Sequence, residues 1–563
     1  MTGVAAVHSA ARRAGRRLDP VTFELLHATL VSAAREMGQV LKHSSRSPII
    51  REMDDFSCAV FRADGDLVAQ ADFIPAQLGA MSLVVKSIIA QWGDRAGPGD
   101  MFLANHPYHG GMHLPDLNLI TPVYAGGTKI AWVGSTAHHI DVGGVRPGSQ
   151  GSDLEQLFAE GLIFSGVRLY TAGVVNPDIT TVLADNVRDP ASTMSDLGAQ
   201  RAACLLGERR VAEAVGRFGA PTVAAGMAQM LDVVEQATRV SLTGLADGQA
   251  EAEGFLDDDG LGGPPVRIHV RMRKTGDQLS VDLSGSDPQV RGALNVPWAS
   301  TRAAVVYLLR AMTDPRAATN DGILRPLTIT CPPGSILNPR PPAAVSVRHN
   351  TCQRLADTLV RCASELWPHK AVASSTVTFF GMHLEGISAI TGNLSVMAEV
   401  VGGGAGAHAG ADGLDGVDTY MSNVGLMPVE VAETTYAVRV LRTELIPGSQ
   451  GLGTFNGGLG IRREYLVLGA PQTATLYAEQ TDPRFRPRGA AGGLAGAPSR
   501  ITVTLPDGSV LPPMTKFTRR LPPGTVVRVE TAGGGGFGDP AGRPGARQAD
   551  DLADGLLPRR EEP

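Results

Sequence analysis

The sequence contains few cysteines, no long apolar run and no excess of positive charge. Five cysteines occur among its 563 residues, an odd number, and no two of them form a CxxC pair. A disulfide framework or a zinc site made of thiolates is therefore not expected. No apolar run reaches the length of a transmembrane helix, so we expect no membrane association and predict the cytoplasm as the compartment.

The formal net charge of −6 does not favour a nucleic-acid partner. Four arginines lie within residues 12–17, but no apolar stretch follows them, so they do not form a secretory signal. The GxSxG nucleophile motif is absent, and no cysteine stands in a catalytic signature. The sequence therefore gives little support to hydrolysis through a covalent serine or cysteine intermediate.

Glycine and proline are abundant, with 68 and 38 residues. This composition favours turns and short strands over long helices. We therefore predict an α+β fold, a mixed and turn-rich protein with several short-stranded, mainly antiparallel sheets and a helical segment near the middle. The length suffices for two to four domains or one large elaborated domain.

The chain divides into five regions by its pattern. Asp19-Pro20 resembles a helix N-cap followed by proline at the first helical position, and apolar residues then recur at helical spacing up to Leu41. Helical spacing returns between Ser192 and Leu245. The predicted regions are a flexible basic tail (1–18), an N-terminal α+β region with a metal-site hairpin (19–190), a helical region (191–250), a glycine-rich α+β region (251–540) and a disordered tail (541–563).

The C-terminal portion of the chain contains several glycine runs. The run GGGAG follows an apparent strand over residues 394–401 and resembles a phosphate-binding loop. It lacks the lysine of a P-loop and the complete dinucleotide fingerprint, so a plain glycine-rich turn is the preferred interpretation.

Five of the thirteen histidines fall within residues 105–144. His113 and Asp116 are three residues apart, and Pro115 between them disfavours a helix. A β-hairpin should follow, with strands over residues 117–124 and 129–135 joined by Gly126-Gly127. The antiparallel return would bring the residues that follow the second strand back toward His113 and Asp116. These residues are His138, His139 and Asp141.

Imidazole nitrogens and carboxylate oxygens at one point suit a divalent ion such as Zn, Mn or Fe. Adjacent residues of a strand point to opposite faces, so only one of His138 and His139 is expected to face the site. The alternative is a solvated loop that is rich in histidine. Asp54, Asp55 and Asp72 lie at the ends of two earlier predicted strands and could join a metal site, although the capping of turns is preferred.

Ordered motifs along residues 19 to 540 resemble the hydantoinase B family. This family includes N-methylhydantoinase and lactamase B subunits, the C-terminal part of 5-oxoprolinase and the metal-binding subunit of acetone carboxylase. The motifs that carry the resemblance include DDFSCAVF, NHPYHGGMHLPD, AHHIDVGG, NPRPPAAVSVRHNTCQR, GGGAGAHAGADG, LGTFNGGLGIRREY and GGGGFGDP.

The resemblance implies a divalent metal held by His113, Asp116 and His138. It also implies an ATP-using A-type partner in a hetero-oligomer, where the partner phosphorylates a carbonyl oxygen of the small-molecule substrate. Asp141 is then a candidate fourth ligand or orienting group. His139 is a candidate acid–base or orienting residue, with packing on the opposite strand face as the alternative. His106 stands where the resemblance implies an aspartate, and Gln77 where it implies a histidine.

Three hypotheses of function follow from the resemblance. The first is the B subunit of an ATP-dependent hydantoinase or lactamase that hydrolyses a phosphorylated cyclic amide with the help of a metal. The second is the metal-binding subunit of a ketone carboxylase. The third is a noncatalytic scaffold for the A-type subunit.

Overall fold

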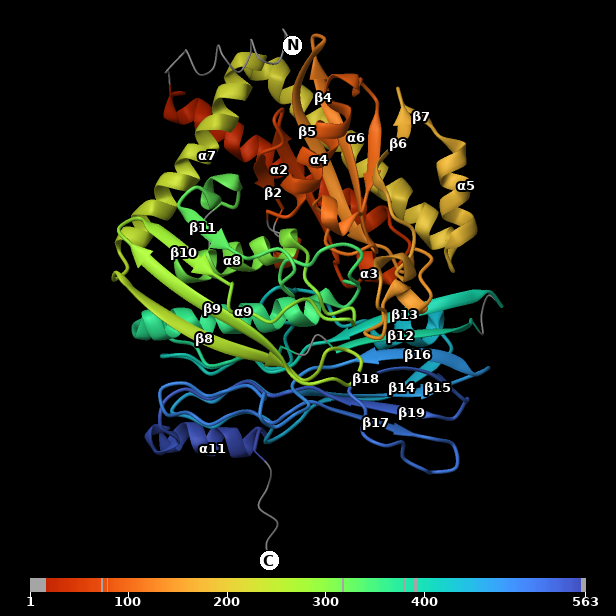
Figure 1. Ribbon diagram of the computed structural model, residues 1–563, viewed down its shortest axis with the longest axis vertical. Helices are drawn as coiled ribbons and strands as arrows, with labels where there is room; N and C mark the ends of the chain where they lie inside the picture. Colours follow the sequence, from red (N-terminus) through yellow and green to blue (C-terminus); the bar gives the residue numbers. More distant parts are fainter. Residues whose placement is uncertain are drawn as a thin grey trace, which may run out of the picture.

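Two long strands, β4 (Asp116–Ala125) and β5 (Thr128–His138), form the central hairpin of the largest sheet (Figure 1). Gly126 and Gly127 join them with φ angles of 57° and 76°, the left-handed conformation that a two-residue hairpin turn requires. The predicted hairpin is confirmed, and its second strand continues past Ser135 to His138.

The computed structural model describes residues 17–71, 74–77, 79–315, 318–377, 380–388 and 392–557. Asp72 and most of the basic segment 1–18 lie outside these residues. The largest sheet is antiparallel, with the strand order β2-β1-β5-β4-β3-β6-β7. Its other strands are β1 (Phe56–Arg62), β2 (Leu67–Gln70), β3 (Met101–Ala104), β6 (Ser165–Thr171) and β7 (Val174–Val175).

Helices cover both faces of this sheet because both faces are apolar. Val60 packs in the cluster that contains helix α2, whereas its neighbour Phe61 packs on the other face with Val84 of helix α4. The Asp19 side chain accepts a hydrogen bond from Thr22 N, which confirms the predicted N-cap. The helices of this half are α2 (Pro20–Ser44), α3 (Pro48–Arg51), α4 (Met81–Trp92), α5 (Pro177–Asn186), α6 (Pro190–Phe218) and α7 (Ala220–Thr243).

Three four-stranded sheets build the rest of the chain, below the first sheet in Figure 1. Helices α8 (Trp298–Met312) and α9 (Arg348–Leu366) pack together, and α9 also packs on the first of these sheets. That sheet contains β8 (Gly248–Leu256), β9 (Val266–Thr275), β10 (Gln278–Asp282) and β11 (Leu327–Thr330).

The other two sheets lie close together. One has the order β13-β12-β16-β18 and the other β14-β15-β19-β17. The fold is therefore α+β with mainly antiparallel sheets, as predicted, and β10–β11 is a parallel pair. The remaining elements are β12 (Phe380–Ile387), β13 (Leu394–Val401), β14 (Val438–Leu445), β15 (Ile461–Val467), β16 (Gln472–Tyr477), β17 (Arg500–Thr504), β18 (Lys516–Leu521), β19 (Val526–Glu530) and α10 (Val429–Thr435).

The glycine runs pack against one another in extended segments outside the strands. Gly534 N donates to Gly458 O at 2.8 Å, and Gly458 N donates to Ala405 O at 2.8 Å. A Cβ atom on Gly404 would lie 2.0 Å from Gly458 O, so only glycine permits this approach. The run GGGAG is thus part of a glycine-rich layer, and it opens no helix of the kind that a phosphate loop precedes.

The region predicted as a disordered tail contains helix α11 (Gly545–Ala553), so this prediction was wrong for residues 541–557. Arg543 anchors the segment, because its guanidinium binds Asp412 and Asp551 at 2.8 and 2.7 Å. Residues 558–563 lie outside the described chain.

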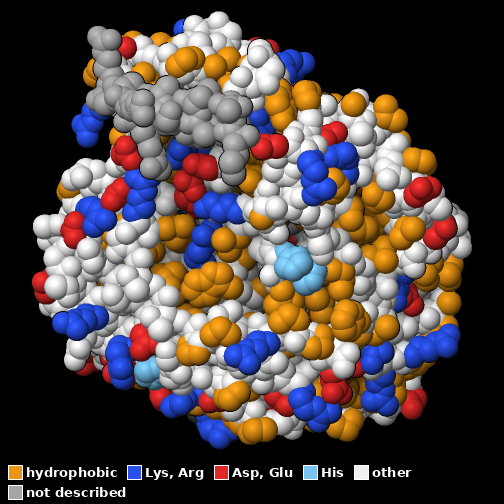
Figure 2. Space-filling model, turned by 45° about the horizontal axis from the view of Figure 1, so that its top comes forward, with side chains coloured by type: hydrophobic (Ala, Val, Ile, Leu, Met, Phe, Trp, Pro, Cys, Tyr) orange, Lys and Arg blue, Asp and Glu red, His pale blue; other side chains and the backbone are white. Residues whose placement is uncertain are grey.

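Among the described residues, no helix has the length and apolar character to cross a membrane. Acidic and basic side chains are interspersed on the face that Figure 2 shows.

Candidate metal centre

His113, Asp116 and His138 meet at one buried point. His113 Nε2 and His138 Nδ1 each lie 3.0 Å from Asp116 Oδ1. One ligand atom from each of the three residues lies within 4.8 Å of the others, and all three side chains are buried. Two imidazole nitrogens and one carboxylate oxygen at this spacing fit a divalent metal ion.

The hairpin itself brings two of these residues together. Asp116 and His138 are cross-strand partners where β4 begins and β5 ends. His113 belongs to the turn before β4, and Asp116 N donates to His113 O at 3.1 Å. The Nδ1 atom of His113 lies 3.1 Å from Ser346 O, so an N–H on Nδ1 leaves the Nε2 lone pair directed at the cluster.

Charge and burial set the protonation of the cluster. Burial lowers the pKa of His113 to about 4, so this imidazole is neutral and able to bind a metal at neutral pH. Burial opposes ionisation of Asp116, but the neighbouring imidazoles of His113 and His138 and the guanidinium of Arg348 outweigh it, and the pKa of Asp116 falls well below its usual value. Arg348 Nη2 donates to Asp116 Oδ2 at 3.0 Å.

The pKa of His138 is raised despite its burial, because Asp116 accepts its hydrogen bond and Asp55 adds negative charge. A metal would therefore have to displace a proton from His138. The other ring nitrogen, Nε2, lies 3.2 Å from the amide nitrogen of Gln150, and the hydroxyl of Tyr477 donates to Gln150 Oε1.

The sequence leaves Asp55 either in a metal site or at the cap of a turn, with capping preferred, and the structure places it beside the cluster. Its Oδ2 atom lies 3.9 Å from His138 Nδ1, and burial raises the pKa of its carboxyl to about 6. The preceding residue, Asp54, has φ 61° and pairs with Lys42 at 2.7 Å. This pairing stabilises the turn that directs Asp55 inward. The sequence shows that Asp55 lies at the end of a strand, but it does not show which distant residues the Asp55 side chain contacts.

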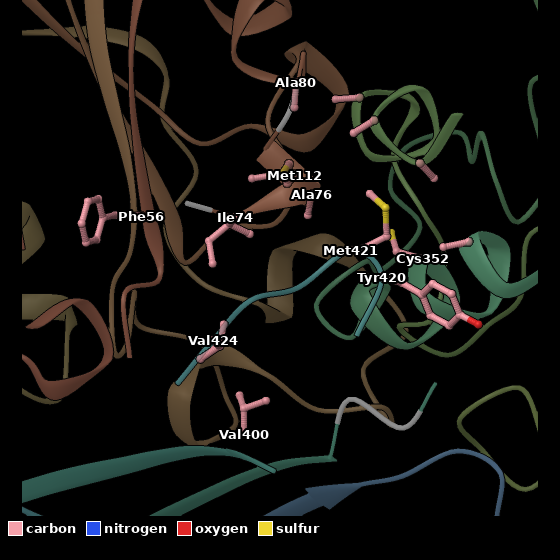
Figure 3. Packing of buried hydrophobic residues seen from close by; sticks show 14 of the residues in the cluster. Phe56, Ile74, Ala76, Ala80, Met112, Cys352, Val400, Tyr420, Met421 and Val424 are labelled. Atoms are coloured by element: carbon pink, nitrogen blue, oxygen red, sulfur yellow. The ribbon is translucent and has the colours of Figure 1, made fainter. Parts of the chain in front are cut away.

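A cavity opens beside the cluster. Its polar end contains the three cluster residues together with Asp55, Arg348 and Gln150. Apolar side chains form much of the remaining wall, which we call the apolar wall, and Figure 3 shows several of them around one shared space. This wall includes Ile49, Ile74, Ala76, Met112, Val400, Met421 and Val424.

Neither His139 nor Asp141 lines this cavity. His139 is fully buried on the opposite face, where its Nε2 lies 3.0 Å from Gln200 Oε1 of helix α6. Asp141 pairs with Arg188 at 2.7 Å and accepts a hydrogen bond from Gly143 N at 3.0 Å. These contacts fix the loop after β5, so we assign neither residue a catalytic role.

Gln77 and His106, the two positions at which this sequence departs from the family pattern, lie in different places. Gln77 is buried and lines the cavity. His106 lies outside it, stacked on His109 with ring centroids 4.1 Å apart. His349 and His383 also line the cavity, and sequence reasoning had missed both because they lie far from the hairpin in the chain.

Comparison with known proteins finds relatives that match nearly the whole chain. The B subunit of a putative D-/L-hydantoinase from Pseudomonas sp. (strain NS671) is 31% identical over 97% of this chain and 94% of its own length. The structure of an ATP-dependent caprolactamase from Pseudomonas jessenii superposes with a TM-score of 0.90 at 27% identity, covering 96% of this chain and 95% of that one.

An acetone carboxylase structure shares the fold, with a TM-score of 0.86 at 20% identity over 96% of this chain and 78% of that one. The Hydantoinase B/oxoprolinase family matches the sequence over residues 19–540. With a match across nearly its whole length, the chain belongs to the hydantoinase B/oxoprolinase family.

Proposed function

We propose that this chain is the B subunit of an ATP-dependent amidohydrolase, which opens a cyclic amide after an A-type partner has phosphorylated the amide oxygen. The observation that carries the proposal is the cluster of His113, Asp116 and His138 at the polar end of a cavity with an apolar wall. The similarity to a hydantoinase B subunit and to an ATP-dependent caprolactamase supports it.

The cluster would hold the metal through His113 Nε2, Asp116 Oδ1 and His138 Nδ1, with the carboxylate of Asp55 beside it. Such an ion, when bound, supplies Lewis-acid chemistry that lowers the pKa of water and polarises the substrate. The neutral His113 and the ionised Asp116 are in the protonation states that metal binding needs.

Arg348 supplies positive charge at the polar end of the cavity. Its Nε atom is buried and has no hydrogen-bond partner in the described part of the chain. Guanidinium groups bind phosphate oxygens strongly, so Arg348 would bind the phosphoryl group of the activated substrate. Asp55 has a pKa near 6 and would accept a proton from the attacking water.

The proposed reaction uses two waters. The oxygen of the first bonds to the former amide carbon, and the ring carbon–nitrogen bond then breaks to give an amine and an acyl phosphate. The second water releases phosphate and leaves a carboxylate. The apolar wall excludes bulk water around the ring carbons of the substrate, and a water-excluded site strengthens the electrostatic contacts of the polar end.

The test is to produce this chain together with an A-type subunit and to measure ATP hydrolysis with hydantoins, lactams, oxoproline and small ketones. We expect a cyclic amide to stimulate ATP hydrolysis and solvent ¹⁸O to enter the carboxylate of the product. His113→Ala should abolish ring opening, whereas His109→Ala, which changes a histidine outside the cluster, should retain it.

Two outcomes would overturn the proposal. Incorporation of labelled bicarbonate into a ketone-derived product would instead show a carboxylase. Full ring-opening activity of His113→Ala, together with purified protein that contains no stoichiometric metal, would show that the chain is a scaffold for the A-type subunit.

A further inference from the structure

The cavity beside the metal cluster contains a single permanently cationic side chain. Among the described residues that line it, Arg348 is the only lysine or arginine. Its guanidinium pairs with Asp116 at 3.0 Å and would bind the phosphoryl group of the activated substrate. A second negative charge on the substrate would therefore find no free lysine or arginine in the described part of the cavity.

The histidines outside the metal cluster add no positive charge to the cavity. His349 and His383 both line it and are buried. An imidazole is mostly neutral above its ordinary pKa of about 6.5. Burial lowers the pKa of His383 to about 3 and holds the pKa of His349 well below its ordinary value. Gln77, which stands where the family resemblance implies a histidine, lines the cavity with an amide that carries no charge.

A carboxylate lines the cavity on the side of β13. Glu399 lies between Ala398 and Val400, and all three residues line the cavity. Arg463 Nη2 lies 3.6 Å from Glu399 Oε2, so the positive charge nearest to this carboxylate is matched by it. In its ionised form, Glu399 would repel an anionic group on the substrate.

The apolar wall sets the character of the rest of the cavity. Figure 3 shows Met112, Val400 and Met421 among the side chains that surround the shared space. Methylene groups of a substrate ring gain binding free energy at such a wall. A carboxylate that moves there from water loses its hydration and finds no cation in exchange, which makes its burial costly.

We propose that this site takes uncharged cyclic amides with an aliphatic body and discriminates against cyclic amides that carry a carboxylate, such as 5-oxoproline. This inference rests on the proposed function and specifies its substrate class. The discrimination follows from the lining of the cavity, where the phosphoryl group takes the free positive charge and the remaining wall is apolar or acidic.

The test compares 5-oxoproline with its carboxamide, which has the same ring and nearly the same shape but no charge. The measurement is ATP-dependent ring opening by the complex of this chain and its A-type partner. We expect kcat/KM to be at least about 100-fold higher for the carboxamide, the scale for a buried charge without a partner. If hydantoins are the rings that the complex opens, hydantoin-5-acetate and hydantoin-5-acetamide form the equivalent pair.

Met421→Lys should relax this discrimination, because lysine has a similar length and adds a positive charge to the apolar wall. Met421 N donates to Gln353 Oε1 at 3.1 Å and Ala76 N donates to Met421 O at 2.8 Å, so both contacts use only the backbone of residue 421. We expect kcat/KM for 5-oxoproline to rise at least about 10-fold relative to the carboxamide. Met421→Gln, which is neutral and of similar length, is the matched control and should keep the wild-type preference.

Val424→Lys is a second variant on the same wall, and metal content and thermal unfolding show whether each variant is folded and loaded. Equal or higher kcat/KM for the carboxylate in the wild-type complex would overturn this inference alone, since cyclic amides would still be opened. A preference that is unchanged in a folded lysine variant would assign the discrimination to the partner subunit and would also overturn it. If the wild-type complex opens no cyclic amide, the proposed function fails and this inference fails with it.

Discussion

His138 Nδ1 and Asp116 Oδ1 lie 3.0 Å apart because the two residues are directly opposed across strands β4 and β5. Their contact is therefore a property of the sheet register, and a shift of one strand by one residue would turn its side chain to the face away from its partner. A rigid antiparallel pair thus supplies two of the three cluster residues, which limits the reorganisation needed to bind a metal.

Replacing Asp116 with asparagine should lower metal affinity by at least about a hundredfold, because the cluster loses its charged oxygen and Arg348 loses its partner. Metal content after dialysis and a chelator competition titration measure the effect. His109→Ala is the control and should keep wild-type affinity. Wild-type affinity in Asp116→Asn would exclude the assigned metal site.

Replacing Gln150 with alanine should weaken metal binding by about 10- to 100-fold, as is usual for groups that orient a metal-binding histidine. With a metal on His138 Nδ1, Nε2 carries the ring N–H, so the Gln150 amide must turn its oxygen to Nε2 and its nitrogen to the Tyr477 hydroxyl, the reverse of the orientation seen here. Tyr477→Phe should therefore weaken binding in the same direction by a smaller factor. The same chelator titration applies. Ser422→Ala, at another position of the cavity wall, is the control, and equal affinities in all four proteins would contradict this role.

The hairpin and the cluster were predictable from the sequence because their signals are local. Gly126-Gly127 marks the turn, and the HxxD spacing places His113 and Asp116 next to the first strand. Arg348 could not be found in this way, since it lies 232 positions after Asp116 and reaches it through the packing of helix α9. His383 and Asp55 likewise arrive from other strands, and only tertiary structure brings them to the cavity.

At two places the structure differs from the local pattern for physical reasons. The composition of residues 541–563 predicts disorder, but the ion pairs of Arg543 with Asp412 and Asp551 hold helix α11 against the glycine-rich layer. His139 was a candidate acid–base residue because of its neighbour His138. Strand alternation turns it toward Gln200 instead, as the alternative interpretation had stated.

Replacing Glu160 with glutamine should stabilise the protein at neutral pH. The Glu160 carboxylate accepts hydrogen bonds from Val345 N and Ser346 N, and burial raises its pKa to about 8. A raised carboxyl pKa disfavours the native state as pH rises, because the unfolded chain ionises first. The stability contributed by the neutral carboxyl is complete below about pH 4.5 and is lost progressively up to about pH 8.

Glutamine keeps the acceptor oxygen and does not ionise. The stability gained by Glu160→Gln relative to wild type should therefore grow by up to about 1.4 kcal/mol per pH unit across this window. Urea unfolding at pH 5.5, 6.5 and 7.5 measures it. Glu24→Gln, at an exposed position of α2, should show no such trend. A gain that does not increase with pH would contradict the assigned burial of this carboxyl.

Replacing Gly534 with alanine should destabilise the glycine-rich layer. A Cβ atom there would lie 1.8 Å from Ala405 O and 2.3 Å from Ala405 C, so two hydrogen-bonded backbone segments would have to separate. Overpacking of this kind costs about 1–3 kcal/mol.

Gly198→Ala is a matched control on the exposed side of α6, where a Cβ meets nothing within 4 Å, and it should stabilise the helix by about 0.5–1 kcal/mol. Thermal unfolding should therefore shift the melting temperature in opposite directions for the two variants. An unchanged melting temperature for Gly534→Ala would show that the glycine segments do not pack as closely as these distances require.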